Sequence, residues 1–398
     1  MFGLIDCNNF FVSCERARDP KLNEQPVIVL SNNEGCIVAL SNEAKALGLK
    51  RSQPYFIVKQ LCETNGVVAL SSNHKLYNSI SLEVMNTLKN IVGNDLEIYS
   101  IDEAFIQITS SVGDLTEFGH YIVDSIMENV GIPVSLGIAR TKTLAKVAAL
   151  FAKRYSGYKG VTLIDTSEKE HKALSMLTCR QIWGIGPRIA SKLESHGINT
   201  ALQFRALPED TIKRMFTLPT QETWLELNGT PAILQQQTPP ERKSISISRT
   251  FPKEVDDFNH LSELLSSFAE KTAENMRQQN LMAKEITVMI RTNRFRALSQ
   301  QYTGTKTIKL PDYTDYTPDI IKAALDGLHE IFNPNYRYKK IGITLHHMCS
   351  RTSHTTNLFA DTRTEAKKER LMKVMDSINS NPKFNRIKMA SNSNKGTK

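Results

Sequence analysis

The sequence predicts a multidomain protein of mixed α and β structure, in the α/β (α+β) class. Its 398 residues are too many for one ordinary domain and indicate two to four modules. Hydrophobic residues make up 40% of the chain and charged residues 23%, so the chain can bury sizeable cores. Predicted strands and helices alternate over residues 1–165, give way to helices alone, and return after a proline-marked linker.

In residues 1–165, short β-branched or apolar runs indicate the strands, and apolar residues three and four positions apart indicate the helices. A hairpin is expected at 26–40 around a turn cluster at 31–35, and a short helix at 41–48 follows it. The other expected elements are a strand at 2–5, a helix at 74–92, a strand at 99–106, a helix at 114–129, a strand at 133–139 and a helix at 141–153.

Residues 166–235 are expected to be entirely helical, with a Gly-Ile-Gly turn at Gly184 to Gly186 between two helices. Glycine lets backbone N–H groups approach a phosphate without a Cβ in the way. Together with Arg188 and Lys192, the turn suggests a helix-hairpin-helix, which usually holds a DNA backbone without reading its sequence. A plain turn between two helices is the alternative.

After a linker at 236–242, the order strand, helix, strand, strand, helix, strand predicts a compact βαββαβ module. Strict alternation from Ser244 to Ser248 implies that one face of its sheet is buried and the other is wet. The predicted elements span 243–251, 259–279, 283–293, 302–310, 318–332 and 338–346. The basic residues expected on the wet face, where they could lie along phosphates, are Arg249, Arg291 and Lys309.

The tail, 349–398, is basic: between Asp361 and Lys398 ten Lys or Arg stand against four Asp or Glu. Leu371, Met375 and Ile378 predict an amphipathic helix there, followed by a disordered end. The formal net charge of the whole chain is +9. This favours an acidic partner, either nucleic acid or a membrane surface, but the charge alone names neither.

Several classes of protein are excluded. No apolar run reaches the roughly 18 residues that span a bilayer, so no membrane protein is expected. The apolar N-terminus lacks a basic leader, so we expect no signal peptide. The six cysteines form no C-x-x-C pair, which argues against a disulfide framework or a zinc knuckle and favours a reducing cytoplasm.

Two strand-like stretches carry carboxylates: Asp102 and Glu103 lie within 99–106, and Asp6 follows the strand at 2–5. Consecutive strand residues point to opposite faces, so Asp102 and Glu103 cannot both be casual surface charges. A carboxylate turned toward a core is costly unless something pairs with it, and a metal ion is a common partner. We therefore expect these three carboxylates to meet around divalent metal ions.

The helix at 141–153 carries Lys142, Lys146 and Lys153 on one side. Such a stripe is either a solvated helix face or a set of cations for phosphates, and the pattern leaves both open.

Three motifs resemble the Y-family DNA polymerases: Asp6 with Asn8-Asn9-Phe10-Phe11, the Ser-Ile-Asp-Glu-Ala box at 100–104, and the segment 137–146. The segments 31–36 and 42–48 are similar to the UmuC branch, the catalytic subunit of bacterial DNA polymerase V. The resemblance covers about residues 1–348, with the motifs in the family's order.

The resemblance implies a right-hand polymerase with a ferredoxin-like palm. It implies a DNA-directed DNA polymerase that copies across damaged bases with low fidelity and no proofreading, in the SOS response to DNA damage. The implied domains are a palm at 1–22 and 73–165, small fingers at 23–72, a helix-hairpin-helix thumb at 166–235, a linker at 236–242, a βαββαβ little finger at 243–348 and a basic tail at 349–398.

The resemblance also implies two Mg²⁺ ions, with Mn²⁺ as a substitute, for the two-metal transfer of a nucleotidyl group. Asp6 and Asp102 would bridge the ions and Glu103 would hold the catalytic one. The backbone carbonyl of Cys7 would complete the site of the nucleotide-side ion.

For the incoming dNTP, Phe11 matches the steric gate that excludes a 2′-hydroxyl, and Phe10 precedes it; a core phenylalanine is the alternative. Lys45 and Lys153 match the cations that bind the triphosphate, and Asn42 falls near the same site.

The implied partners are primer–template DNA, a UmuD′ dimer and a RecA filament, in the cytoplasm at the nucleoid. A segment at 355–359 resembles a sliding-clamp peptide ending in Leu358-Phe359, but it lacks the usual leading glutamine, so weakened clamp binding is expected. Two other functions stay open: a non-catalytic helix-hairpin-helix repair protein that binds DNA, and a metal-dependent nuclease.

Overall fold

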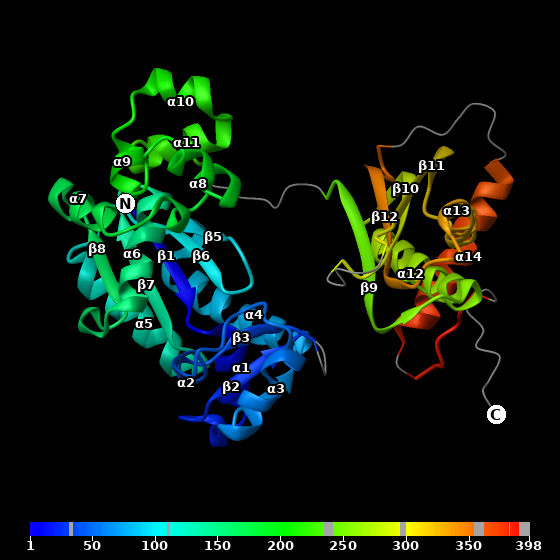
Figure 1. The fold of residues 1–398 in the computed structure, drawn as a ribbon, viewed down its shortest axis with the longest axis horizontal. Helices are drawn as coiled ribbons and strands as arrows, with labels where there is room; N and C mark the ends of the chain where they lie inside the picture. Colours follow the sequence, from blue (N-terminus) through cyan, green and yellow to red (C-terminus); the bar gives the residue numbers. More distant parts are fainter. Residues whose placement is uncertain are drawn as a thin grey trace. The chain divides into compact units, whose positions relative to one another are not determined.

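The structure is a computed structural model, which describes residues 1–31, 35–109, 112–234, 242–294, 300–353, 362–381 and 383–389. The chain forms two compact units, Met1–Pro239 and Pro240–Lys398 (Figure 1). Mixed α/β structure in more than one unit confirms the predicted fold class. Within the described residues, no helix is both long and apolar enough to cross a membrane.

The first unit is built on a five-stranded sheet in the order β5-β6-β1-β7-β8. The central strand β1 pairs antiparallel with β6 on one side and with β7 on the other, while β7 and β8 are parallel. The strands are β1 (Phe2–Cys7), β5 (Leu96–Ile98), β6 (Glu103–Gln107), β7 (Val134–Ala139) and β8 (Val161–Ile164).

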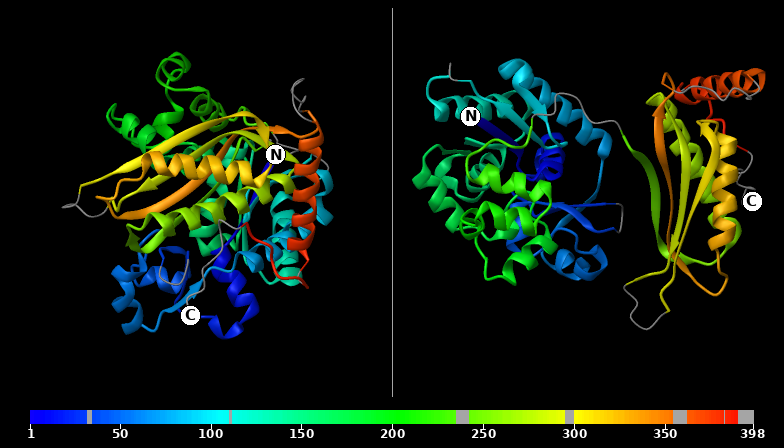
Figure 2. Two further views of the ribbon diagram at one scale, coloured as in Figure 1. Left: turned by 90° about the vertical axis from the view of Figure 1, so that its right-hand side faces the viewer. Right: turned by 90° about the horizontal axis from the view of Figure 1, so that it is seen from above.

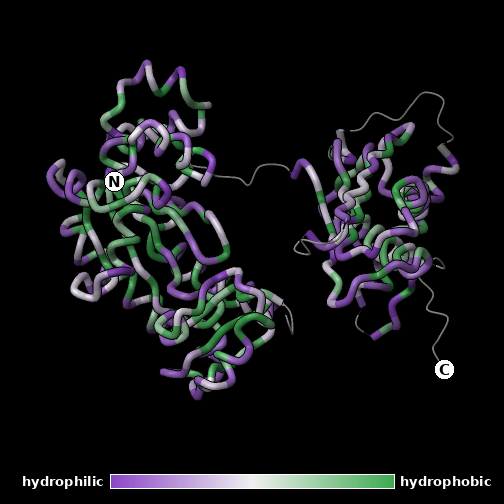
Figure 3. Tube along the Cα trace, viewed as in Figure 1, coloured by the Kyte–Doolittle hydropathy of each residue, from purple (hydrophilic) through white to green (hydrophobic). Residues whose placement is uncertain are grey.

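Both faces of this sheet are covered. Alternate residues such as Ile5 and Ile106 pack against α4 (His74–Val92) and α5 (Leu115–Val130). The opposite set, including Leu4 and Phe105, packs against α6 (Lys142–Arg154). The helix α6 lies directly on β7, because a Cβ at Gly137 would come within 2.0 Å of the Ala149 nitrogen. Hydrophobic residues accordingly gather in the interior (Figure 3).

A smaller three-stranded sheet, in the order β3-β2-β4, carries its own apolar core. The antiparallel pairing of β2 with β3 confirms the predicted hairpin, although residues 32–34 of its turn lie outside the described residues. The elements here are α1 (Phe10–Arg18), η1 (Pro20–Leu22), β2 (Val27–Leu30), β3 (Ile37–Leu40), α2 (Asn42–Ala46), α3 (Tyr55–Thr64) and β4 (Val68–Ser71).

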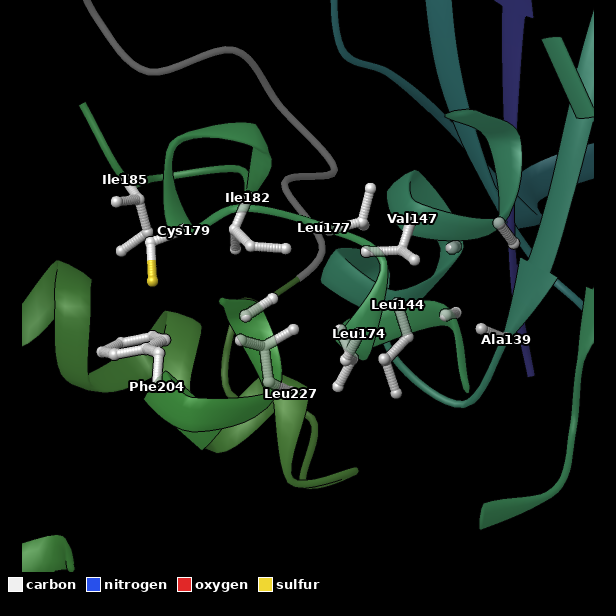
Figure 4. Packing of buried hydrophobic residues seen from close by; sticks show 14 of the residues in the cluster. Ala139, Leu144, Val147, Leu174, Leu177, Cys179, Ile182, Ile185, Phe204 and Leu227 are labelled. Atoms are coloured by element: carbon white, nitrogen blue, oxygen red, sulfur yellow. The ribbon is translucent and has the colours of Figure 1, made fainter. Parts of the chain in front are cut away.

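Short helices follow β8 and extend the core that α6 begins, as Figure 4 shows for Leu144, Leu174 and Phe204. They are α7 (Ser167–Ser175), η4 (Cys179–Gln181), α8 (Pro187–Glu194), α9 (Ala201–Arg205), α10 (Glu209–Met215) and α11 (Leu218–Leu227); two further short 3-10 turns are η2 (Gly93–Asp95) and η3 (Ser156–Tyr158).

Buried acidic side chains hold these helices against the start of α6 and against one another. The carboxylate of Glu226, on α11, accepts from the Thr143 N–H at 2.9 Å, and its backbone carbonyl accepts from the Thr141 hydroxyl at 2.9 Å. Glu170, on α7, is fully buried and pairs with Arg140 and Arg205. Because each acid is satisfied by charges or N–H donors, burial does not leave it isolated.

The second unit is a four-stranded antiparallel sheet in the order β11-β10-β12-β9 with α12 and α13 on one face (Figure 2). This confirms the predicted order of strands and helices. The elements are β9 (Ser244–Val255), α12 (Phe258–Gln278), β10 (Leu281–Arg291), β11 (Thr303–Thr314), α13 (Thr317–Ile331), β12 (Tyr338–Ser350) and α14 (Thr362–Ser380).

The predicted amphipathic helix of the tail is α14, and of its predicted apolar positions only Leu371 lies off the buried face. Met372 and Met375 are buried, whereas Leu371 is 52% exposed. Arg277 of α12 makes two hydrogen bonds to Asp376, at 2.6 and 2.8 Å, so a charged contact fixes which side of α14 faces the core. The sequence pattern could not show this contact, because its partners are 99 residues apart.

Candidate active site

The three predicted carboxylates lie at one end of the central sheet. Asp6 is the last residue but one of β1, and its cross-strand partner is Glu103, the first residue of β6. Directly opposed residues point to the same face, here the face that α6 covers. We predicted a strand over residues 99–106, but Asp102 lies just before β6. Its backbone carbonyl accepts a hydrogen bond from the Cys7 N–H at 2.9 Å.

The turn before β6 is closed by Ser100. Its hydroxyl accepts from the N–H groups of Asp102 and Glu103 at 3.2 and 3.0 Å and donates to Asp102 Oδ1 at 2.6 Å. A serine that bonds backbone groups two and three residues ahead is a known turn device. Ser100 was not predicted as a site residue, although its position two residues before Asp102 is the signal that could have found it.

Two lysines of α6 reach these carboxylates. Lys153 Nζ lies 2.5 Å from Asp6 Oδ1, and Lys146 Nζ lies 2.9 Å from Glu103 Oε1. All four side chains are partly exposed. The alternative of a solvated lysine stripe is therefore wrong for these two residues, because this side of α6 faces the carboxylate end of the sheet.

The third lysine, Lys142, is buried. Its ammonium group lies 2.6 Å from Glu97 Oε2 and donates to the Leu234 carbonyl at 3.0 Å, with both charged side chains at most 8% exposed. Lys142 is thus unavailable to a phosphate in this structure, and the stripe divides into one structural lysine and two at the site.

The carboxylates influence one another. Burial raises the pKa of Asp6 above its usual value, the Lys153 ammonium opposes this, and the negative charges of Glu103 and Asp102 raise the pKa further. Neighbouring negative charges disfavour full ionisation of the group. A cation placed among the three groups would relieve the repulsion.

The carboxylates share a sheet end but do not form a finished metal site. Among the described residues, no three His, Cys, Asp or Glu side chains form a group that could hold a metal ion. Lys153, Lys146 and Ser100 each engage one carboxylate instead. The donor chemistry nevertheless fits Mg²⁺, which prefers oxygen ligands and takes few carboxylates. Burial raises the pKa of the Cys7 thiol far above its usual value, so Cys7 offers no thiolate.

A second cluster lies where the triphosphate was predicted. Lys45 Nζ donates to Asn9 Oδ1 at 2.6 Å and to Asn42 Oδ1 at 3.2 Å, and Asn9 Nδ2 donates to Asn42 Oδ1 at 3.1 Å. Burial, and then the nearby charge of Lys153, lower the pKa of Lys45. The two lysines therefore repel each other, as expected of a site for an anion.

Asn9 was not predicted. It stands at the N-cap of α1 with φ of 49°, in the left-handed region that asparagine tolerates better than most residues. An asparagine between a strand and a helix is the signal that could have found it.

The two phenylalanines of α1 differ. The Phe11 ring is half-buried and stacks on Tyr77, with 4.2 Å between centroids and 14° between planes. It leans edge-on against His74 at 5.9 Å. Phe10 is 3% exposed and packs in the core, so its ring is not available to a nucleotide. The predicted dNTP contact of Phe10 would therefore have to come from its backbone, because the first turn of α1 points its side chain inward.

The Gly-Ile-Gly turn has two different glycines. Gly184 has φ of +86°, and a Cβ there would meet Thr223 Oγ1 at 2.5 Å. Gly186 is the N-cap of α8, and a Cβ there would meet nothing within 4 Å. The open space in front of α8 leaves its first N–H groups accessible to an anion. The element directly before the Gly-Ile-Gly turn is the 3-10 turn η4, so the turn joins η4 to α8 rather than two α-helices as predicted.

The basic residues of α8 differ in availability. Arg188 is exposed. Lys192 donates to the Met215 carbonyl at 2.6 Å and lies over the Phe216 ring at 5.0 Å. In this structure Lys192 is a helix-to-helix contact, which a phosphate would have to displace.

In the second unit, the strand register separates the predicted basic residues. Arg291 pairs with Lys340 and Lys309 pairs with Glu285, which places both on the polar face. Arg249 pairs with Ile341, a core residue, and so lies on the helix-covered face, although it is exposed. Placing all three on one face was wrong, because Arg249 continues the odd-numbered series of Ile245 and Ile247. The clamp-like residues Leu358 and Phe359 lie outside the described residues.

A solved structure shares this fold. The structure matches a solved Y-family DNA polymerase chimera with a TM-score of 0.71 and 22% identity, covering 88% of this chain and 100% of that chain. The molecule therefore has the Y-family DNA polymerase fold.

Sequence comparisons give the family. The impB/mucB/samB family model matches residues 5–150, and the model of its C-terminal domain matches residues 242–358. Protein UmuC of Salmonella typhimurium is 37% identical over 95% of this chain and 90% of that protein, and protein ImpB of Salmonella typhimurium is 35% identical over 96% and 91%. The chain belongs to the impB/mucB/samB family.

A more distant relative is a DNA polymerase IV from Alkaliphilus oremlandii, 28% identical over 86% of this chain and 84% of that protein. The higher identity to UmuC and ImpB confirms the predicted resemblance to the UmuC branch.

Proposed function

We propose that this chain is an error-prone DNA-directed DNA polymerase that performs translesion synthesis in the SOS response. The observation that carries the proposal is the position of Asp6, Asp102 and Glu103 at one end of the β1–β6 pair, within a Y-family fold. The names of the relatives, protein UmuC and DNA polymerase IV, support it.

In the proposed site, Asp6 and Asp102 would serve both Mg²⁺ ions, Glu103 would hold the catalytic one, and the backbone carbonyl of Cys7 would serve the nucleotide-side one. Bound Mg²⁺, or Mn²⁺ in its place, stabilises the charge that develops on the attacking and leaving oxygens. The chain's own part is to hold these oxygen ligands on a rigid strand pair, with Ser100 fixing the turn that carries Asp102.

The proposed triphosphate site uses Lys45, Lys153 and Asn42, joined by Asn9. Lys153 pairs with Asp6 in this structure, so nucleotide and metal binding would exchange that carboxylate for a phosphate oxygen. The repulsion between Lys45 and Lys153 falls when an anion lies between them.

DNA binding is proposed at two surfaces. A backbone phosphate would be held at the start of α8 by Gly184, Gly186 and Arg188. Lys192 would also bind this phosphate once its ammonium group leaves the Met215 carbonyl. In the second unit, Arg291 and Lys309 lie on a polar face rich in hydroxyl groups. Arg249 would bind from the opposite face of the sheet, where its side chain is exposed.

The finer organisation is also a proposal: palm at 1–22 and 73–165, fingers at 23–72, thumb at 166–235, little finger at 243–348. The partners we propose by family are a UmuD′ dimer and a RecA filament, with weak binding of a sliding clamp through Leu358 and Phe359. Six cysteines without a disulfide among them suit the cytoplasm, where the chain would act at the nucleoid.

One assay tests the function: a primed template with dNTPs and Mg²⁺, comparing wild type with Asp102→Ala. We expect extension by the wild type, and no extension by the variant. Degradation of the primer would instead indicate a metal-dependent nuclease, and binding without turnover would indicate a repair accessory protein.

Removing the Phe11 ring should admit ribonucleotides. Phe11 stacks on the buried Tyr77, which fixes its ring in place. In Phe11→Ala we expect ribonucleotide incorporation, relative to dNTP, to rise about ten- to a hundred-fold, the range for a group that shapes a pocket. Primer extension with matched rNTP and dNTP measures this. Phe384→Ala, which removes an exposed ring in the other unit, is the control. Equal discrimination by Phe11→Ala and wild type would disprove the steric gate.

Removing the charge of Lys45 should weaken dNTP binding. A charge-assisted hydrogen bond contributes about 1.5–3 kcal/mol, so Lys45→Met should raise the KM for dNTP about ten-fold or more. Lys59→Met removes an exposed lysine paired with Glu63 and should leave the KM unchanged. An unchanged KM in Lys45→Met would remove this residue from the triphosphate site.

A further inference from the structure

Lys146 is held by three aromatic rings as well as by Glu103. Its Nζ lies 4.4 Å from the ring centroid of Tyr99, 5.1 Å from that of Trp183 and 5.8 Å from that of Phe105. We call these three rings the aromatic box. A cation over an aromatic face is attracted by about 0.5–2 kcal/mol.

The rings of the aromatic box also hold one another. Tyr99 meets Trp183 edge to face, with 5.5 Å between centroids and 85° between planes, and meets Phe105 at 5.6 Å. The indole N–H of Trp183 donates to the Tyr99 hydroxyl at 3.1 Å. Edge-to-face pairs add about 0.5–1.5 kcal/mol beyond burial, so the box is a built enclosure rather than a chance contact.

Within this enclosure, the Lys146 ammonium has a fixed place beside Glu103. Its side chain is only 16% exposed, although lysine side chains are usually exposed to solvent. It contacts one carboxylate oxygen, Oε1, which leaves Glu103 a second oxygen for a metal ion. The contact therefore orients the carboxylate without occupying both of its oxygens.

The wall formed by Trp183 comes from a different part of the unit. Trp183 immediately precedes Gly184 and the α8 hairpin that we propose holds DNA, whereas Tyr99 and Phe105 flank the carboxylates themselves. A shift of the hairpin would move one wall of the box.

We propose that Lys146 is a positioning residue: the aromatic box fixes its ammonium, which holds Glu103 in its working orientation, and Trp183 makes that orientation depend on the hairpin. The proposal rests on the proposed polymerase function of the same site.

Kinetics give the first test, on the full chain with primed template. Lys146→Met should lower kcat about ten-fold with little change in the KM for dNTP. It should also lower the Mg²⁺ concentration at half-maximal rate, because a positive charge beside a metal ligand opposes the ion. Lys146→Arg should recover most of the rate. A merely structural lysine would give no such fall in the Mg²⁺ requirement. Lys213→Met, which removes an exposed lysine, is the control.

Coupling is the second test. In a double-mutant cycle, Trp183→Leu alone should lower kcat. Adding it to Lys146→Met should lower kcat little further, because the two changes remove the same interaction between Trp183 and Lys146. Independent, multiplicative losses would overturn the role of Trp183.

The third test needs no turnover. The chain has two tryptophans, so Trp224→Phe leaves Trp183 as the one tryptophan whose emission is followed. In that background, Lys146→Met should change the emission of Trp183, and Lys213→Met should not. No emission change, or an unchanged kcat or Mg²⁺ requirement in Lys146→Met, would overturn the proposal. If the wild type fails to extend primers, the polymerase function fails, while the emission still reports whether the box holds Lys146.

Discussion

Replacing Asp6 by asparagine should lower the rate of primer extension by about a thousand-fold or more. Asp6 lies directly opposite Glu103 and interacts electrostatically with both other carboxylates. Removing its charge therefore changes the electrostatics of all three groups. Loss of a bridging carboxylate removes several kcal/mol of metal-dependent stabilisation, and each 1.36 kcal/mol corresponds to about a ten-fold change in rate. The amide is nearly isosteric, so the β1–β6 pairing should survive.

The measurement is single-turnover extension, with dNTP binding followed separately by titration. Asp6→Asn should weaken both, because Asp6 is proposed to hold the nucleotide-side ion as well as the catalytic one, and it also pairs with Lys153. Glu103→Gln should lose turnover more than nucleotide binding, because Glu103 is assigned to the catalytic ion alone. Asp165→Asn, at an exposed ion pair with Lys169, is the matched control. Equal losses of binding and turnover in Glu103→Gln would contradict this division.

The carboxylates and the succession of strands and helices along the chain could be predicted from sequence, because both are local signals. An acidic residue inside or beside an apolar run, such as Asp6, is visible without knowing any contact. The alternation of β9 and the helix periods of α4, α5 and α6 likewise lie within single elements. These patterns defined both units and the sheet end that carries the site.

What could not be predicted depends on contacts between distant elements. The spacing of the three lysines of α6 places them on one face. In the structure, Lys142, Lys146 and Lys153 each pair with a different acidic residue. The pairs are separated by 45, 43 and 147 residues. The aromatic box likewise joins Trp183 to Tyr99 across 84 residues. The spacing of apolar residues within one helix does not show which of its charged residues will be buried against an opposite charge.

Replacing Lys142 by methionine should be among the most destabilising single changes in the first unit. Lys142 and Glu97 are buried together, and Lys142 also donates to the Leu234 carbonyl. Removing one partner leaves a buried, uncompensated charge, which costs about 3–5 kcal/mol. Unfolding can be followed by tryptophan emission, because Trp183 and Trp224 both lie in this unit. Lys213→Met, at an exposed pair, should unfold like the wild type.

The double variant Lys142→Met with Glu97→Leu separates burial of a charge from loss of attraction. If the single variant is destabilised by the isolated carboxylate, replacing that carboxylate by a hydrophobic group should recover most of the free energy of unfolding. The Leu234 carbonyl would still lose its donor, so recovery should be incomplete by about 1 kcal/mol. A double variant no more stable than Lys142→Met would mean that the attraction itself, rather than the avoided desolvation, stabilises this corner of the unit.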